Sequence, residues 1–226
     1  MTHRNICLYL DRTLMYEPGL YDMIYNNCHY LFKSKNELQL AVYDWCYIKD
    51  QSMVEKKYGH ISLWNTSLIT DMSGLFSLKS EFNENINNWD VSNVITVEAI
   101  FEGCSQFNQP LNNWDVSNVK NMDYMFGDCH EFNQPLNNWN VSSVQNMQSM
   151  FRYSNFNQPL NTWDVSNVKY MQWMFYRCPF NHCINNWDVK NVVNMRWMFY
   201  YCSYNKRLDN WGISNVSGVG GIFNYL

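Results

Sequence analysis

Hydrophobic positions recur along this chain with a period of roughly 24–25 residues, beginning near residue 61. A tryptophan marks each of the seven repeats, at Trp64, Trp89, Trp114, Trp139, Trp163, Trp187 and Trp211. Mostly hydrophobic residues follow it at the second, fifth and eighth positions, and the twelfth is always phenylalanine, from Phe76 to Phe223. Such a period is typical of repeat proteins, in which each repeat buries its hydrophobic side chains against the next.

Within one repeat the spacing of hydrophobic residues predicts both strands and a helix. Closely spaced hydrophobic residues predict short strands at 111–114 and 118–122. Residues 122, 125, 126 and 129 are spaced like one or two turns of helix. The predicted fold is therefore a leucine-rich-repeat-like solenoid of about seven rungs. Each rung of roughly 24–25 residues would contain short β-strands plus a short helix.

The segment before the repeats carries signals for two helices. Ser34 followed by Glu37 forms a capping box, and a second box, Ser52 with Glu55, predicts a shorter helix that ends at Gly59. We expect these helices to form an α-helical N-terminal cap over the first rung, because an uncovered end would expose hydrophobic surface. The predicted division is 1–60 for the N-terminal segment and cap, and 61–226 for the repeats.

Charge and hydropathy narrow the possible partners and the location. The formal net charge is -4, and neither part of the chain is strongly basic, which argues against nucleic-acid binding. No run of 18 hydrophobic residues exists, so we expect no membrane insertion. The N-terminal hydrophobic run Ile6 to Leu10 is too short for a signal peptide, which predicts an intracellular protein, in the host cytoplasm if the source is viral.

Repeated polar residues and cysteines raise two metal-site hypotheses that we weigh against structural roles. Aspartate follows four of the tryptophans, as in Asp115, and stacked carboxylates could bind calcium. We favour backbone hydrogen bonding by these side chains within a turn. Four of the eight cysteines share one repeat position, which favours reduced core thiols over disulfides or zinc ligands. We expect no cofactor and no metal. No nucleophile or phosphate-binding motif is present, so we expect no enzyme.

Candidate functional residues lie where the repeats differ, at the tenth, thirteenth and fourteenth positions after tryptophan. Aromatic and arginine side chains gather there in the later repeats, and these residue types anchor protein interfaces. The alternative is that Trp173 and Trp197 only pack on each other. The candidate partner surface comprises Tyr124, Arg152, Tyr153, Trp173, Tyr176, Arg177, Trp197, Tyr200 and Tyr201.

The motif WDVSNVKNMDYMF followed by CxxFNQPLNN resembles the BspA-type leucine-rich-repeat family, and most closely its branch described as a mycoplasma domain of unknown function. The segment from Asn36 to Phe76 is similar to the lead-in of giant-DNA-virus versions. The resemblance implies a solenoid with a binding or adhesive role and no known catalytic residues.

Two functions follow as hypotheses. The first is a non-enzymatic repeat scaffold that binds another protein, a host protein if the source is viral. The alternative is a structural or surface protein of a virion or cell, with an adhesive or glycan-binding role. The uncovered C-terminal rung is a candidate surface for end-to-end self-association.

Overall fold

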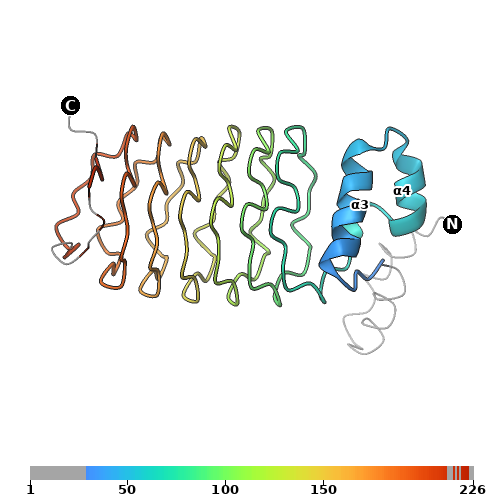
Figure 1. The fold of residues 1–226 in the computed structure, drawn as a ribbon, viewed down its shortest axis with the longest axis horizontal. Helices are drawn as coiled ribbons and strands as arrows, with labels where there is room; N and C mark the ends of the chain where they lie inside the picture. The colour runs from blue at the N-terminus through green and yellow to red at the C-terminus, as the bar shows by residue number, and fades with distance from the viewer. Residues whose placement is uncertain (1–28, 213–215, 217, 219, 224–226) are drawn as a thin grey trace.

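The repeats form a row of stacked coils, each running from one repeat tryptophan to the next (Figure 1). The computed structural model describes residues 29–212, 216, 218 and 220–223. Single parallel β-bridges join the seventh residue after one tryptophan to the same position in the next coil. They connect Asp71, Thr96, Asn121, Asn146, Tyr170, Asn194 and Gly218 in series.

The predicted leucine-rich-repeat-like solenoid of strands and helices is wrong, because the coils contain neither element among the described residues. Over residues 122–128, backbone N–H groups alternate between two kinds of acceptor. Tyr124 and Phe126 donate to the next coil at 2.9 Å, whereas Met125 and Gly127 donate to carbonyls three residues back. A strand needs a continuous ladder and an α-helix needs bonds four residues back, so this alternation produces neither.

Left-handed backbone at two positions also prevents the helix predicted at residues 122–129. Tyr124 has φ 53° and Asp128 has φ 58°. L-residues rarely adopt this conformation, and it reverses the direction of the chain locally. The hydrophobic spacing predicts a helix here because tight turns, like helices, place every third or fourth side chain on one side.

The predicted core columns are confirmed. Phe126 is fully buried and its ring lies 5.6 Å from Phe101 in one neighbouring coil and 5.7 Å from Phe151 in the other. Within its own coil Phe126 stacks on Phe132 at 3.9 Å. Aromatic burial of this kind, repeated in every coil, is the main source of stability that the stack has.

Polar side chains of the repeat join the coils or close their turns. The Trp114 indole Nε1–H donates to the carbonyl of Ile86 at 3.1 Å, and Asn118 Nδ2 donates to the carbonyl of Ser92 at 2.8 Å. The Asp115 carboxylate accepts the backbone N–H of Ser117 at 3.1 Å, which confirms the predicted turn role of the aspartates. Hydrogen bonds from Ser117 lower the pKa of Asp115.

The shared cysteine position lies in the core, as predicted. Cys104 and Cys129 are fully buried, and the Cys129 thiol donates to the carbonyl of Phe101 at 2.9 Å. All six cysteines of the described residues are free thiols. Burial raises the pKa of Cys129 well above its usual range, so the thiol is unreactive in the folded stack.

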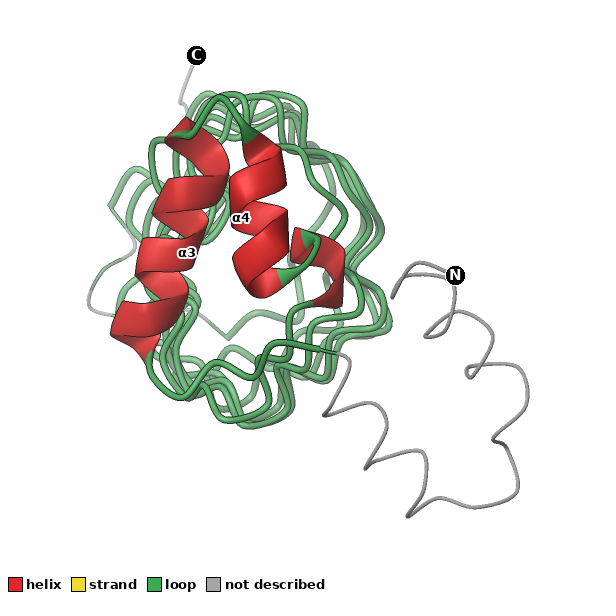
Figure 2. Ribbon diagram, turned by 90° about the vertical axis from the view of Figure 1, so that its right-hand side faces the viewer, coloured by secondary structure: helices red, strands yellow, loops and turns green. Residues whose placement is uncertain are grey.

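Two α-helices precede the coils and lie across the end of the stack (Figure 2). Helix α3 spans Lys35–Tyr47 and has Ser34 as its N-cap, as predicted, with the Ser34 hydroxyl accepting the N–H of Glu37. Helix α4 spans Gln51–Tyr58 and ends at Gly59, but its N-cap is Asp50 and not Ser52. A single 3₁₀ turn, Ile61–Leu63, leads into the first coil.

The cap covers the first tryptophan. Trp45 of α3 meets Trp64 edge-to-face at 5.9 Å, and Tyr58 of α4 does so at the same distance. Lys35 forms an ion pair with Asp71 of the first coil at 3.0 Å. These contacts cover the hydrophobic surface at the N-terminal end of the stack. The C-terminal coil is described only in part, so end-to-end self-association through it stays a prediction.

Candidate functional site

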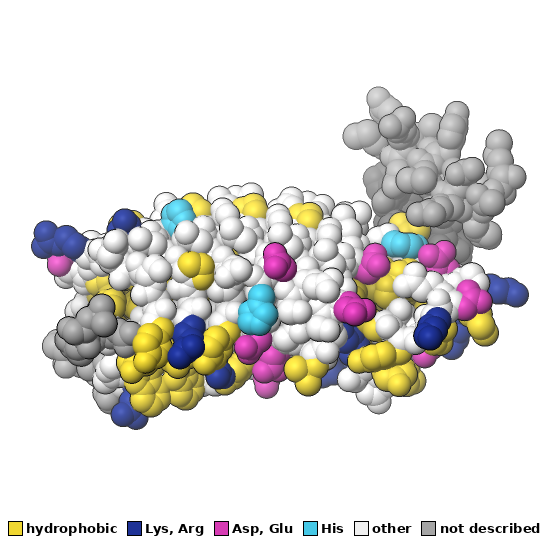
Figure 3. Space-filling model, turned by 90° about the horizontal axis from the view of Figure 1, so that it is seen from above, with side chains coloured by type: hydrophobic (Ala, Val, Ile, Leu, Met, Phe, Trp, Pro, Cys, Tyr) yellow, Lys and Arg dark blue, Asp and Glu magenta, His cyan; other side chains and the backbone are white. Residues whose placement is uncertain are grey.

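The structure brings all nine predicted surface residues together on the C-terminal coils. Six of them line one groove of about 430 Å³, namely Tyr124, Arg152, Trp173, Tyr176, Trp197 and Tyr200. The other three, Tyr153, Arg177 and Tyr201, contact these through their rings or guanidinium groups. We call the nine residues the aromatic–arginine surface. Figure 3 shows hydrophobic side chains gathered with basic ones toward the C-terminal end of the stack.

Two rows of stacked rings form the walls of the groove. Trp173 and Trp197 stack at 5.5 Å with an interplanar angle of 18°, and Tyr176 and Tyr200 stack at 5.9 Å and 8°. The alternative weighed from the sequence, that the tryptophans pack on each other, therefore describes a real contact. All four rings nevertheless remain half-buried and line the groove. The rings therefore pack between coils and also remain partly exposed in the groove.

Arginine side chains lie against the tyrosines in a fixed arrangement. The Arg152 guanidinium lies 5.1 Å from the ring of Tyr153, and its Nη1 donates to the Tyr124 hydroxyl at 3.3 Å. Arg177 lies between Tyr153 at 5.5 Å and Tyr201 at 4.7 Å. Cation–π contacts of this kind hold the guanidinium groups in place against the rings.

Bulky residues of this surface occupy backbone positions that favour glycine. Wherever the structure describes them, the tenth and fourteenth positions of the coils have positive φ, and three coils place Gly74, Gly103 and Gly221 there. Six surface residues occupy the same positions, with φ between 52° and 56°: Tyr124, Tyr153, Trp173, Arg177, Trp197 and Tyr201. A left-handed L-residue costs about 1–2 kcal/mol, so glycine would stabilise the backbone better. Such strain is typical of functional sites.

One residue beside this surface was not predicted from the sequence: Arg196, which lies 5.2 Å from the ring of Trp197. This arginine stands at the ninth position, where the second to fifth coils carry carboxylates or amides such as Asp123 and Gln172. The change of charge at the ninth position from one coil to the next is the feature of the sequence that could have identified Arg196. Burial and repulsion from Glu98 raise the pKa of Asp123 to about 6.

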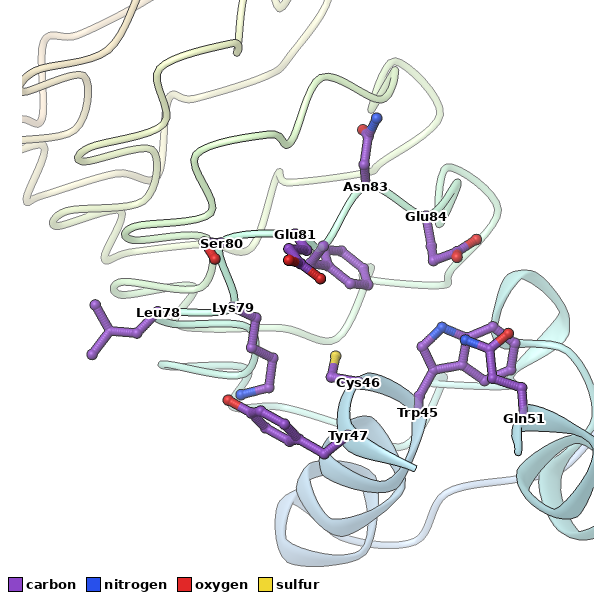
Figure 4. A pocket seen from close by; sticks show the side chains of 11 residues that line it. Trp45, Cys46, Tyr47, Gln51, Leu78, Lys79, Ser80, Glu81, Asn83 and Glu84 are labelled. Carbon is purple, nitrogen blue, oxygen red and sulfur yellow. The ribbon is translucent and has the colours of Figure 1, made fainter. Parts of the chain in front are cut away.

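A second groove, of about 450 Å³, lies between the end of α3 and the first coil (Figure 4). Trp45, Cys46 and Tyr47 form one side, and residues 78–84 form the other. It was not predicted, because its two sides come from separate segments of the sequence that no periodicity relates. The side chains mix hydrophobic, basic and acidic types without a convergent polar centre, so the groove defines no chemistry.

Two properties of the described residues bear on other functional classes. No group of three or more His, Cys, Asp or Glu side chains in this part of the chain is placed to hold a metal ion. None of its helices has the length and hydrophobicity needed to cross a membrane.

The fold and the surface define a class of protein: a row of near-identical coils that presents a variable aromatic and basic face. The family model described as "Mycoplasma protein of unknown function, DUF285" matches residues 47–155 and 139–226. The chain belongs to this family. Searches of curated proteins and of solved structures gave no match.

Proposed function

We propose that the chain is a non-enzymatic repeat scaffold whose aromatic–arginine surface binds another protein. The main support is the left-handed backbone of the surface. At the tenth position Gly74, Ala99 and Ser149 show that small residues suffice for folding, whereas Trp173 and Trp197 place large rings on the same strained backbone. Side chains that the fold does not require, at positions where they cost stability, point to a use outside the fold.

The composition of the groove supports a protein partner. Protein interfaces concentrate their binding energy in Trp, Tyr and Arg side chains, and these three types make up the entire lining. The rings are held by neighbours, which lowers the entropy lost when a partner binds. If the source is a large DNA virus, as the resemblance implies, the partner would be a host protein. The free thiols of the described cysteines support an intracellular location.

Affinity capture followed by quantitative mass spectrometry tests the proposal. The bait proteins are the wild type, a Trp173→Ala, Trp197→Ala, Tyr201→Ala triple variant, and a Leu40→Ala control. Leu40 is a suitable control because it is an exposed hydrophobic residue of helix α3 and lies outside the aromatic–arginine surface. Partners should be recovered by the wild type and the control and lost by the triple variant. Equal recovery by all three baits would place binding elsewhere.

The second candidate is a structural or surface protein with an adhesive or glycan-binding role. Its support is the row of half-buried rings, which could also pack against sugars, and the exposed Asn140 in a glycosylation sequon. A glycan array probed with the wild type and the triple variant tests it, together with mass spectrometry of Asn140. Surface-dependent binding to glycans, or a glycan on Asn140, would favour this candidate over the first.

A further inference from the structure

The face that carries the aromatic–arginine surface changes sign along the stack. Its ninth to fourteenth positions carry four carboxylates in the second and third coils: Glu98, Glu102, Asp123 and Asp128. At the same positions of the next three coils, the only charged residues are arginines, namely Arg152, Arg177 and Arg196. Figure 3 shows acidic side chains near the middle of the molecule and basic ones toward its C-terminal end.

These seven charges have no ion-pair partner among the described residues. The three ion pairs found there use Lys35 with Asp71, Lys190 with Asp188, and Arg207 with Asp209. Glu102 accepts only a long hydrogen bond from Ser77 at 3.4 Å, and Arg177 contacts only tyrosine rings within the described part of the chain. Asp123 is shielded, because one of its carboxylate oxygens is fully buried and the other accepts a hydrogen bond from Gln148 at 3.4 Å. The other six charges form two strips of opposite sign on the face.

The tenth position changes in size along the same direction. Gly74 and Ala99 in the first two coils are small, and Trp173 and Trp197 in the fifth and sixth are large. The two middle coils reverse the order, with Tyr124 in the acidic third coil and the fully buried Ser149 in the basic fourth coil. Toward the two ends of the face, the large side chains lie in the basic coils and the small ones in coils that carry no arginine at these positions.

We propose that this face binds a second copy of the chain, in an antiparallel dimer whose two-fold axis passes between the third and fourth coils. The proposal rests on the proposed function and names the partner of the same surface. In a two-fold dimer one patch meets itself reversed, so each residue contact occurs twice. Here the first coil of one copy faces the sixth coil of the other, and the second faces the fifth.

Both size and charge complement each other in this register. Large residues oppose small ones at the tenth position, and carboxylates oppose arginines. The size pairs are Trp197 with Gly74 and Trp173 with Ala99, whereas Ser149 is fully buried and forms no such pair. The charge pairs are Arg177 with Glu98 and Glu102, and Arg152 with Asp128. Arg196 faces the uncharged first coil.

Shifting the copies by one coil removes this complementarity. The axis would then pass through the fourth coil, so Arg152 would face its own copy and Trp173 would face Tyr124. Like charges placed opposite each other are unfavourable, and two large rings cannot share one gap. The opposite shift places the axis through the third coil, so that Tyr124 and Asp128 face their own copies and Arg177 faces the uncharged first coil. The register with the axis between the third and fourth coils therefore keeps the most opposite-charge pairs.

The size of the face sets the expected affinity. Neighbouring coils are about 5.6 Å apart, as judged from Phe76 and Phe101, so six coils span about 28 Å. A strip of this length and about 15 Å wide buries roughly 800–900 Å² over both copies, below the 1,200–2,000 Å² of stable complexes. We expect a reversible dimer with a dissociation constant on the order of 10 µM.

Sedimentation velocity over about 1–200 µM protein, at about 50 mM and about 300 mM salt, tests the dimer. The wild type should shift from monomer to dimer across this range, more weakly at high salt. Arg177→Glu and Glu102→Arg should each weaken the dimer at least tenfold, because each places like charges together twice. The control Arg207→Glu removes an exposed arginine outside the face and should leave dimerisation unchanged.

The decisive experiment mixes the Arg177→Glu and Glu102→Arg variants and measures their association. In the mixed dimer every Arg177–Glu102 contact is again between opposite charges, once native and once exchanged, so association should return to near the wild-type level. The double variant should also dimerise, and circular dichroism shows which variants are folded. A monomeric wild type at the highest concentration, or no recovery on mixing, overturns the proposal.

Two further outcomes separate this proposal from its alternatives. A dimer that persists in both charge variants would place association at the ends of the stack, and would overturn the antiparallel dimer. If the wild type is monomeric but still captures a foreign partner through Trp173 and Trp197, the proposed function stands and only the self-partner fails.

Discussion

Ala99→Gly should stabilise the folded chain, although the same substitution usually destabilises proteins. Ala99 has φ 51°, and relief of a left-handed L-residue is worth about 1–2 kcal/mol. Glycine offsets about 0.5–1 kcal/mol of this gain, because it loses more conformational entropy than alanine when the chain folds. Loss of a half-buried methyl group costs a few tenths of a kcal/mol more. The expected gain in the free energy of unfolding is about 0.5 kcal/mol.

The chain supplies a matched control, because Ala41 is its only other alanine. Ala41 is fully buried inside helix α3, where glycine costs about 1 kcal/mol in helix propensity and about 0.8 kcal/mol for the lost methyl. Ala41→Gly should therefore destabilise by about 2 kcal/mol. The reverse change, Gly74→Ala at φ 64°, should destabilise by about 0.5–1 kcal/mol, since a Cβ there meets no atom within 4 Å and only backbone strain acts.

Urea unfolding followed by tryptophan fluorescence measures all three variants. A protein concentration of about 1 µM keeps self-association from contributing. The slopes with denaturant should match the wild type, so that the midpoints report stability. If Ala99→Gly lowers the midpoint as Ala41→Gly does, the tenth position carries no strain. The argument that Trp173 and Trp197 are placed there for a purpose outside the fold would then fail.

Three other measurements test the fold and its charges. Asp123→Asn should raise stability by about 1 kcal/mol at pH 8 and by almost nothing at pH 4. Because the pKa of Asp123 in the folded chain is about 6, its ionisation lowers the stability of the wild type as pH rises from about 4 through 6. The side chain is about half-exposed, so solvent screening makes this loss of stability smaller than the pKa shift alone implies. Asn118→Ala should cost about 1 kcal/mol in urea unfolding by removing the 2.8 Å bond to the Ser92 carbonyl, and an unchanged midpoint would refute its role in joining coils. A thiol reagent should label the exposed Cys183 quickly and the buried Cys129 only on unfolding; fast labelling of both would contradict the packed core.

The core could be predicted from the sequence because it depends on side-chain columns alone. Phe126 and Trp114 stand at fixed distances along the chain, and any stack with that period brings them against their equivalents. The cap helix α3 could also be predicted, because Ser34 and Glu37 act within one turn. Both predictions rest on local or strictly periodic information.

The backbone path could not be predicted in the same way. Whether Tyr124 donates its N–H within the coil or to the next coil depends on the carbonyl of Gln148, which the sequence around Tyr124 does not specify. A left-handed φ at Tyr124 or Trp173 runs against the preference of these residue types, so no local signal announces it. The candidate surface was found from variation between repeats, but its groove and the contact of Arg196 with Trp197 required the coordinates.

Columns that fold the chain and columns that vary are separated in space. Trp114, Phe126 and Asn118 bond or stack with neighbouring coils, so a change in any one of them disturbs more than its own coil. The tenth position tolerates far more variation, since glycine, alanine, serine, tyrosine and tryptophan all occupy it on the same backbone, even though Trp173 and Trp197 stack on each other. A stack built in this way can vary one face, coil by coil, while its interior stays constant. The change from carboxylates in the second and third coils to arginines in the next three is therefore a property that folding does not impose, and under our proposal it serves recognition of a partner.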